Sequence, residues 1–292
     1  MTMQRSVLSG SIGVLVSIAA GPAFADSTIC ATLPSWATLK TALAGSITPT
    51  NGANGGLGFN MWATLVANDG TVCAVAFSGQ KYADQWLGSR VISAQKANTA
   101  NDFSLGANST PGASLFPQGL ALSTANLFSA VQPGGSLFGL QESNPVDTFV
   151  AYSNGLGPAN AASFGTPNDP MVGLRIGGIN VFGGGLALYL GGVKVGGVGV
   201  SGDTSCTDHM VAWRVRNALK LDGFEGVGGV SGDAAHPDNI IFDITANPDG
   251  TGGTGQAPNG TGGVGTSASG FGHPKCLNNP TPTALSDLPP VH

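Results

Sequence analysis

Residues 197–202 and the polar residues that follow them have the types and spacing for two kinds of chemistry. Residues 197–202 (GVGVSG) form a literal GxGxxG stretch, and Asp222 lies 20 residues after its last glycine. A dinucleotide-binding turn has this pattern, because its glycines let a pyrophosphate approach the backbone and its acidic residue binds the ribose. Ser201, Asp208 and His209 also offer the residue types of a hydrolytic nucleophile and its base.

The surrounding sequence weakens both interpretations. The glycines continue a β-rich segment typical of the second strand of a hairpin, and no parallel strand of comparable strength follows Leu221. The chain has no GxSxG nucleophile elbow, and His209 is too close in sequence to be a persuasive base. We therefore interpret residues 197–202 as a glycine-rich strand that another backbone, a flat ring or a partner subunit can approach closely.

A third kind of chemistry is the binding of haem. Haem needs an axial ligand for its iron, small residues beside the ring, apolar contacts, and cations for its propionates. His209 or His273 could be the ligand, and the segment at residues 196–202 is small. Apolar contacts and cations could come from Phe103, Trp213, Arg90, Lys96, Arg214 and Arg216. The residue types for haem are therefore all in the chain, although the pattern alone does not bring them together.

Two predicted hairpins and three predicted helices would position these residues. Residues 61–67 and 71–78 are β-rich runs on either side of Asn68-Asp69-Gly70, a strong hairpin signal because Asn and Gly accept positive φ. Further predicted elements are a hairpin of 185–190 and 193–201, helices at 35–44, 89–103 and 207–219, and an edge strand at 239–244. This order predicts an α+β fold with helices flanking an antiparallel sheet of four or five strands.

Lys96 lies on a half-apolar face of the helix predicted at residues 89–103. Ile92, Lys96, Thr99 and Phe103 share that face by their helical spacing. Two interpretations follow for the lysine. Its ammonium either extends along the surface to solvent at a domain edge, or it points into a pocket.

Two segments differ in composition from the predicted core. Residues 104–170 are rich in Gly, Pro, Ser and Asn, with one short helical patch near residues 120–130. We expect an ordered insertion that wraps the core or builds an oligomer contact, because its aromatic residues would otherwise be exposed. These are Phe116, Phe128, Phe138, Phe149, Tyr152 and Phe164. From residue 246 a Gly/Pro-rich tail is expected to be loosely ordered except near Cys276.

Residues 1–25 are predicted to be a cleavable export signal. Arg5 precedes an interrupted apolar run and the small-x-small sequence Ala23-Phe24-Ala25, and the run is too short to span a bilayer. We therefore expect a periplasmic or secreted protein comprising a domain at 26–245 and the tail at 246–292, with no membrane insertion after cleavage. Removal of the signal leaves 10 Lys plus Arg against 16 Asp plus Glu, a charge balance that disfavours nucleic acid as a partner.

The four cysteines, Cys30, Cys73, Cys206 and Cys276, all lie in the part that would be exported. An even number in an exported chain predicts two disulfides, and four cysteines allow three pairings. We favour Cys30 with Cys73 and Cys206 with Cys276, because the second bridge would attach the tail to the body of the protein. The chain has no CxxC spacing that would indicate a metal site.

Two blocks of the sequence together resemble the GlcG/HbpS-like family of haem-binding, sometimes called haem-degrading, proteins. The first spans residues 66–103 and is similar to the family's D-G hairpin and its A-x-K-A-x-T-A helix, carried here by Ala94, Lys96, Ala97, Thr99 and Ala100. The second spans residues 195–213 and matches V-G-x-x-G-V-S-G-x-T-x-x-x-D through Gly199, Val200, Ser201, Gly202, Thr204 and Asp208. Together the blocks cover about a fifth of the chain.

The resemblance implies an antiparallel α+β domain, often oligomeric, with haem as its ligand. On this basis the cofactor-binding residues would be Arg90, Lys96, Thr99, Ser201, Gly202, Asp208 and His209. Lys96 and Arg90 would lie near the propionates, and His209 would be the candidate axial ligand of the iron. The implied function is an exported protein that sequesters, senses or helps to degrade haem. Two alternatives remain, a homo-oligomer of the same fold that is structural or binds a non-haem small molecule, and an oxidoreductase acting on a small acid.

Overall fold

A four-stranded antiparallel sheet with the order β2-β1-β5-β4 forms the centre of the structure. The structure is a computed structural model that describes residues 28–47, 54–107, 109, 115–152, 161–244, 266–280 and 287–292. The predicted signal at residues 1–25 lies outside the described residues, as do parts of the insertion and of the tail. The prediction of an α+β fold is confirmed, with four strands in the central sheet.

Both predicted hairpins form. Their strands are β1 (Trp62–Ala67), β2 (Val72–Phe77), β4 (Gly185–Leu190) and β5 (Val193–Ser201). The turns contain Gly70 at φ 82° and Gly191 and Gly192 at φ 57° and 74°, a region that favours glycine over other residues. β1 and β5 pair antiparallel from Trp62 opposite Ser201 to Ala67 opposite Gly196, so the two hairpins form one sheet.

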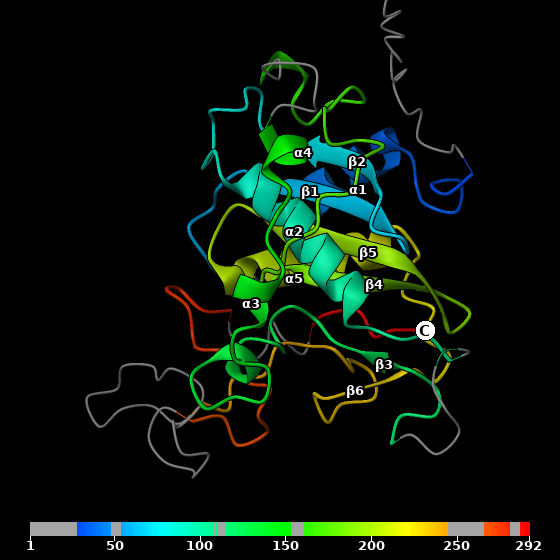
Figure 1. The fold of residues 1–292 in the computed structure, drawn as a ribbon, viewed down its shortest axis with the longest axis vertical. Coiled ribbons are helices and arrows are strands. Elements are labelled where there is room, and N and C mark those ends of the chain that lie inside the picture. The colour runs from blue at the N-terminus through cyan, green and yellow to red at the C-terminus, as the bar shows by residue number, and fades with distance from the viewer. Residues whose placement is uncertain are drawn as a thin grey trace, which may run out of the picture.

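Three helices cover the two faces of the sheet (Figure 1). They are α1 (Trp36–Ile47), α2 (Ser89–Asp102) and α5 (Ser205–Ala218), each within a few residues of its predicted range. α1 and α5 pack on one face, where Leu43 and Trp213 join the core that contains Leu65 of β1. α2 packs on the other face, where Ala94 and Ala97 contact a second core around Trp62. Among the described helices, none is long and apolar enough to cross a membrane.

All but the last residue of the GxGxxG stretch lie in β5, directly beneath α2. A Cβ atom at Gly197 would collide with the carbonyl oxygen of Ala97, and one at Gly199 would collide with that of Ser93. β5 pairs antiparallel with both of its neighbours, so these glycines do not open the parallel βαβ unit that a dinucleotide site requires. The alternative interpretation is confirmed, because the small strand allows the backbone of a helix to approach closely.

The described part of the 104–170 insertion is spread over both edges of the central sheet, with α4 (Thr148–Tyr152) near β2 and β3 (Leu120–Ala121) beyond β4 (Figure 1). Its other elements are η1 (Ser129–Val131), α3 (Leu140–Ser143) and η2 (Ala161–Ser163), and β3 pairs with β6 (Gly228–Gly229). Val150 and Ala151 of α4 join the core around Val91 of α2. Phe138, Phe149 and Tyr152 remain 59–68% exposed, so the ordering of this segment does not bury all of its aromatic residues.

Two predicted elements differ from the structure. The helical patch predicted near residues 120–130 is helical only at its end. Leu120 and Ala121 form β3, because Leu120 pairs with Leu105 and with Gly228, residues 124–128 form turns, and Ser129–Val131 form the 3-10 helix η1. Residues 239–244 add no strand to the central sheet, and only Ile244 makes an isolated bridge, to Ser267. In both segments the apolar residues pack against neighbouring loops instead of following a regular period.

Both favoured disulfides are present in the structure, and the chain end is more firmly packed than its composition predicted. Cys30 pairs with Cys73, and Cys206 pairs with Cys276. The side chain of Leu288 is buried in the main core. Trp213 Nε1 donates to the carbonyl oxygen of Pro289 at 2.8 Å, and Val291 N donates to that of Ala235 at 2.9 Å. The described residues of the tail therefore form part of the folded domain.

The close approach of α2 to β5 predicts that Gly199→Ala destabilises the protein. The added methyl group would meet a helix carbonyl that can move only with the backbone, so we expect a loss of about 1–3 kcal/mol or more. Gly45→Ala in α1 is the matched control, because nothing lies within 4 Å of its added Cβ. This control should be neutral or stabilising by up to about 1 kcal/mol. Urea unfolding measures both, and equal effects would contradict the packing argument.

Candidate functional site

A cavity of about 300 Å³ opens where α2, the end of β5 and the start of α5 meet. Its lining residues are Trp86, Ser89, Ile92, Lys96, Phe182, Ser201, Asp203, Ser205 and Asp208. Both blocks that carry the family resemblance contribute to this lining. The first supplies Trp86, Ser89, Ile92 and Lys96, the second supplies Ser201, Ser205 and the two carboxylates, and Phe182 lies in neither block.

A buried ion pair lies at the cavity. Lys96 Nζ is 2.7 Å from Asp208 Oδ2 and donates to the carbonyl oxygen of Val200 at 3.1 Å. The other carboxylate oxygen, Asp208 Oδ1, accepts from the backbone N–H of Asp203 at 2.8 Å. Lys96 is 1% exposed and Asp208 is 2% exposed. The pocket interpretation of Lys96 is therefore confirmed, and the alternative of a lysine extended to solvent is wrong.

Burial changes the protonation of both members of this pair. It lowers the pKa of the Lys96 ammonium, and it raises the pKa of Asp208 to about 6 although the lysine charge acts in the opposite direction. The two shifts make the difference between the pKa of Lys96 and the pKa of Asp208 smaller than it is in water. The pair lies beside a cavity large enough for a small organic group.

Asp203 holds an apolar loop at the cavity mouth. Its carboxylate accepts the backbone N–H of Leu57 at 2.9 Å and that of Phe59 at 3.1 Å. The ring of Phe59 meets that of Trp86 edge to face, with 5.2 Å between their centroids. Phe59, Trp86 and Phe182, which we call the aromatic rim, are 39%, 54% and 48% exposed. Exposed aromatic surface of this kind next to a cavity is typical of a binding site.

Some polar groups of the lining remain available to a ligand. Lys96 has three N–H groups, of which two are used by Asp208 and Val200. The hydroxyl groups of Ser89 and Ser201 form no hydrogen bond with the other described residues. One ammonium N–H and two hydroxyls can therefore meet oxygen atoms of a bound molecule.

The structure brings only part of the expected cofactor-binding set to the cavity. Lys96, Ser201 and Asp208 line it, whereas the other expected residues, Arg90, Thr99, Gly202 and His209, do not. Thr99 Oγ1 donates to the carbonyl oxygen of Gln95 at 2.8 Å, and Gly202 packs against the backbone of Asn60. These two positions serve local packing rather than the cavity.

Arg90 is buried elsewhere, on the side of α2 that faces the insertion. Its guanidinium donates from Nε to Asp169 Oδ2 at 2.9 Å and from Nη1 to the carbonyl oxygen of Ala151 at 2.9 Å. It also lies 4.0 Å from the ring centroid of Phe164. The structure therefore gives no support to the expectation that Arg90 would bind a propionate, because its guanidinium is paired inside the protein and does not line the cavity.

His209 is fully buried on α5 and does not line the cavity. Its Nε2 atom lies 3.2 Å from Asn239 Oδ1 and 3.2 Å from the backbone N of Ile240, while Nδ1 has no hydrogen-bond partner among the described residues. Burial lowers the pKa of His209 to about 4. These surroundings do not support His209 as an axial ligand, because no face of the imidazole is open to a haem.

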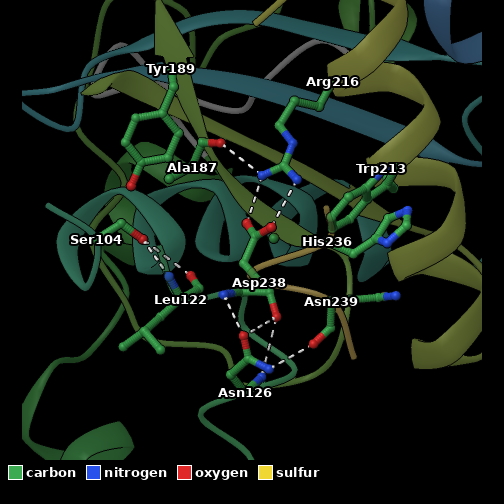
Figure 2. A network of polar contacts seen from close by, with 12 residues as sticks. Ser104, Leu122, Asn126, Ala187, Tyr189, Trp213, Arg216, His236, Asp238 and Asn239 are labelled. Atoms are coloured by element: carbon green, nitrogen blue, oxygen red, sulfur yellow. Dashed lines mark hydrogen bonds and ion pairs between the residues drawn. The ribbon is translucent and has the colours of Figure 1, made fainter. Parts of the chain in front are cut away.

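Arg216 and Trp213, also considered for haem, belong to a second buried network (Figure 2). Arg216 Nη1 and Nη2 donate to the two carboxylate oxygens of Asp238 at 2.6 and 2.9 Å, and both residues are fully buried. The guanidinium lies 4.4 Å from the Trp213 ring centroid. This network fixes the chain after β6 against α5 and leaves no free cation there.

Several cavity residues were not predicted as site residues. Trp86, Phe182 and Asp203 are the most informative of these. A signal existed for Trp86, because a single tryptophan stands in a polar connector between a strand and a helix. Phe182 had none, since it reaches the cavity from a segment that follows the insertion and precedes β4.

Comparisons with known proteins agree with the resemblance noted in the sequence. A family model described as haem degrading protein HbpS-like matches residues 56–216, more than half of the chain. Among solved structures, the Klebsiella pneumoniae protein ORFY is 22% identical with a TM-score of 0.39, covering 64% of this chain and 90% of its own. PduOC in complex with haem is 20% identical with a TM-score of 0.38, covering 63% and 91%. No curated protein matches.

The buried pair predicts a large cost for Lys96→Met. The substitution leaves the Asp208 carboxylate buried without its partner, so we expect a loss of about 3–5 kcal/mol of unfolding free energy. Lys96→Met/Asp208→Leu should cost less than the sum of the single changes. Arg175→Met is the control, because Arg175 pairs with Asp69 at the surface and should contribute less than about 1 kcal/mol. Equal losses of unfolding free energy in Lys96→Met and Arg175→Met would contradict the prediction.

Two buried imidazoles predict a loss of stability in acid. Burial lowers the pKa of His209 and of His273 from 6.5 to about 4, so their contributions are complete above pH 6.5 and are lost as the pH falls toward 4. Each contributes up to about 3 kcal/mol. The raised pKa of Asp208 acts in the opposite direction between pH 6 and 4. We expect a net loss on acidification from pH 7 to 4, measured by urea unfolding.

His273→Gln tests this assignment, because it removes one of the two imidazoles. The variant should lose less stability than the natural chain between pH 7 and pH 4. An unchanged pH dependence would show that His273 does not contribute to it.

Proposed function

The chain belongs to the HbpS-like haem-degrading family, and from this premise we propose that it is an exported protein that binds haem at the cavity between α2, β5 and α5. The observation that carries the proposal is the position of the cavity. All of its lining residues, from Trp86 to Asp208, fall inside the matched span of residues 56–216. Binding there would serve the sequestration, sensing or degradation of haem.

The chemistry of the lining fits one part of haem and not another. The aromatic rim and Ile92 offer apolar surface to a flat ring, and Lys96 offers one N–H to a propionate. No His, Cys, Met or Tyr stands among the described lining residues, so the cavity supplies none of the usual side-chain ligands of haem iron. The cavity and its rim therefore offer contacts to the ring and edge of a haem but no ligand for its iron, and we derive no step at the iron.

Two observations support export. The predicted signal at residues 1–25 has the charge, the apolar run and the small-x-small sequence of a secretory leader. All four cysteines are paired in the structure, which is the pattern of proteins from oxidising compartments. A periplasmic or secreted location remains part of the proposal.

A second candidate function, binding of a non-haem small molecule, is favoured by the free polar groups of the cavity. The Lys96 N–H and the hydroxyls of Ser89 and Ser201 suit the oxygen atoms of a small anion such as a carboxylate. A homo-oligomer that forms without haem and shows no spectral response to hemin would favour this function. An oxidoreductase acting on a small acid gains no support from the GxGxxG stretch, which packs against α2.

The haem proposal predicts a Soret shift when hemin is titrated into the purified protein at micromolar concentration. Trp86→Ala removes the largest apolar side chain of the rim and should weaken hemin binding by about tenfold or more. Phe138→Ala is the matched control, because Phe138 is an exposed aromatic residue outside the cavity lining. It should bind hemin as the natural chain does.

Absence of any Soret shift would overturn the proposal, and equal binding by both variants would move the site away from the cavity. His209→Gln tests whether His209 is the iron ligand, independently of where the haem binds. We expect its Soret maximum to match that of the natural chain, because the imidazole is buried and does not line the cavity.

A further inference from the structure

Three potential metal ligands meet at the start of α5, outside the set of residues that forms the cavity. The two bonded sulfur atoms of the Cys206–Cys276 disulfide and a ring nitrogen of His273 all lie within 4.8 Å of one another. Cys206 and His273 are buried, at 0% and 1% exposure. Among the described residues, this is the only cluster of three such groups. Two sulfurs and an imidazole are the ligand set of many zinc sites.

The protonation of His273 suits a metal ligand. Its Nδ1 atom lies 2.7 Å from the carbonyl oxygen of Pro274, which can only accept, so Nδ1 carries the proton. Nε2 is then the basic nitrogen, and it lies 3.2 Å from Ser205 Oγ, while Nδ1 lies 4.0 Å from Cys206 Sγ, so the ring must turn or shift to present Nε2 to a metal between the sulfurs. Metal-binding histidines commonly donate their other N–H to a backbone carbonyl in this way. Burial lowers the pKa of His273 to about 4, so the imidazole is neutral at physiological pH.

Cys276 lies beside polar groups at the start of α5. The backbone N–H of Cys206, in the first turn of α5, donates to Cys276 Sγ at 3.2 Å. Ser205 Oγ lies 3.4 Å from the same sulfur. These contacts are made by a disulfide sulfur, and after reduction the same groups would lie beside the Cys276 thiol.

We propose that, when the Cys206–Cys276 disulfide is open, these three residues bind one zinc ion. The open form exists in the newly made chain before oxidation, or after a dithiol transfers two electrons and two protons to the disulfide and itself becomes a disulfide. Zinc then displaces the two thiol protons and binds two thiolates and the His273 nitrogen, which leaves a fourth position for water. The disulfide and the metal ion are alternative ways to attach residues 266–280 to α5.

The other disulfide provides an internal comparison. The Cα atoms of Cys30 and Cys73 are 5.5 Å apart, close to the 6.0 Å between those of Cys206 and Cys276. Among the described residues, however, no histidine or carboxylate forms a cluster with Cys30 and Cys73. Cys73 Sγ contacts only the carbonyl oxygen of Thr71 among the hydrogen bonds found there. Two thiols alone make a weak site, so metal binding should follow the second pair.

Cobalt titration of the reduced protein tests the proposal, because thiolate-bound Co²⁺ is coloured. The purified chain carrying Cys30→Ser/Cys73→Ser is reduced with a phosphine, and CoCl₂ is added without oxygen. We expect one equivalent of Co²⁺ to bind with thiolate-to-cobalt absorption, and ZnCl₂ to displace it. His273→Gln in the same background should weaken binding by more than about 100-fold, beyond the usual effect of losing an outer-shell partner.

Three results would overturn the proposal. The first is no cobalt absorption in the reduced Cys30→Ser/Cys73→Ser protein, and the second is equal affinity in its His273→Gln variant. The third applies if reduction unfolds the protein, as seen by circular dichroism, and ZnCl₂ then fails to restore the folded signal. If ZnCl₂ restores the folded circular dichroism signal in the protein with His273 but not in its His273→Gln variant, the result would support the site. Cys206→Ser/Cys276→Ser should show no cobalt absorption in either case.

Discussion

The buried pair of Lys96 and Asp208 is the interaction on which the architecture around the cavity depends. Lys96 belongs to α2 and Asp208 to α5, and these helices lie on opposite faces of the sheet. The pair therefore joins the two helical layers past the end of β5, where Lys96 also bonds the carbonyl oxygen of Val200. Placing two charges away from water is costly, and the cost is offset only when both partners and their hydrogen bonds stay in place. This requirement fixes the start of α5 relative to α2.

The glycines of β5 make this pair possible. Because Gly197 and Gly199 carry no side chains, the backbone of α2 can lie directly on the strand, and Lys96 reaches past it toward α5. Alanines on the facing side of α2 complete the close contact. The stretch that looks like a phosphate-binding motif is thus a packing device, and its chemical effect is indirect, through the position of one lysine.

Pairing of charges also shapes what the protein can bind. Arg90 and Arg216 are neutralised by Asp169 and Asp238 inside the fold, so neither offers its charge to a ligand. The cavity keeps apolar surface, two free hydroxyls and one ammonium N–H. A ligand would accordingly be held by ring contact and a few oxygen atoms more than by strong charge. The lining therefore suits an apolar ring with a few oxygen atoms, and it offers no histidine to an iron.

The sequence by itself determined the hairpins, the three main helices and the α+β class, because these follow from local periodicity and from turn residues such as Asn68 and Gly70. It also placed Lys96, Ser201 and Asp208 in one candidate site through two recognisable blocks. Only the tertiary structure decided that His209 and Arg90 face inward, that Phe182 reaches the cavity, and that His273 lies beside the Cys206–Cys276 bridge. Those outcomes depend on which buried partner each side chain meets across long stretches of chain, and no local pattern carries that information.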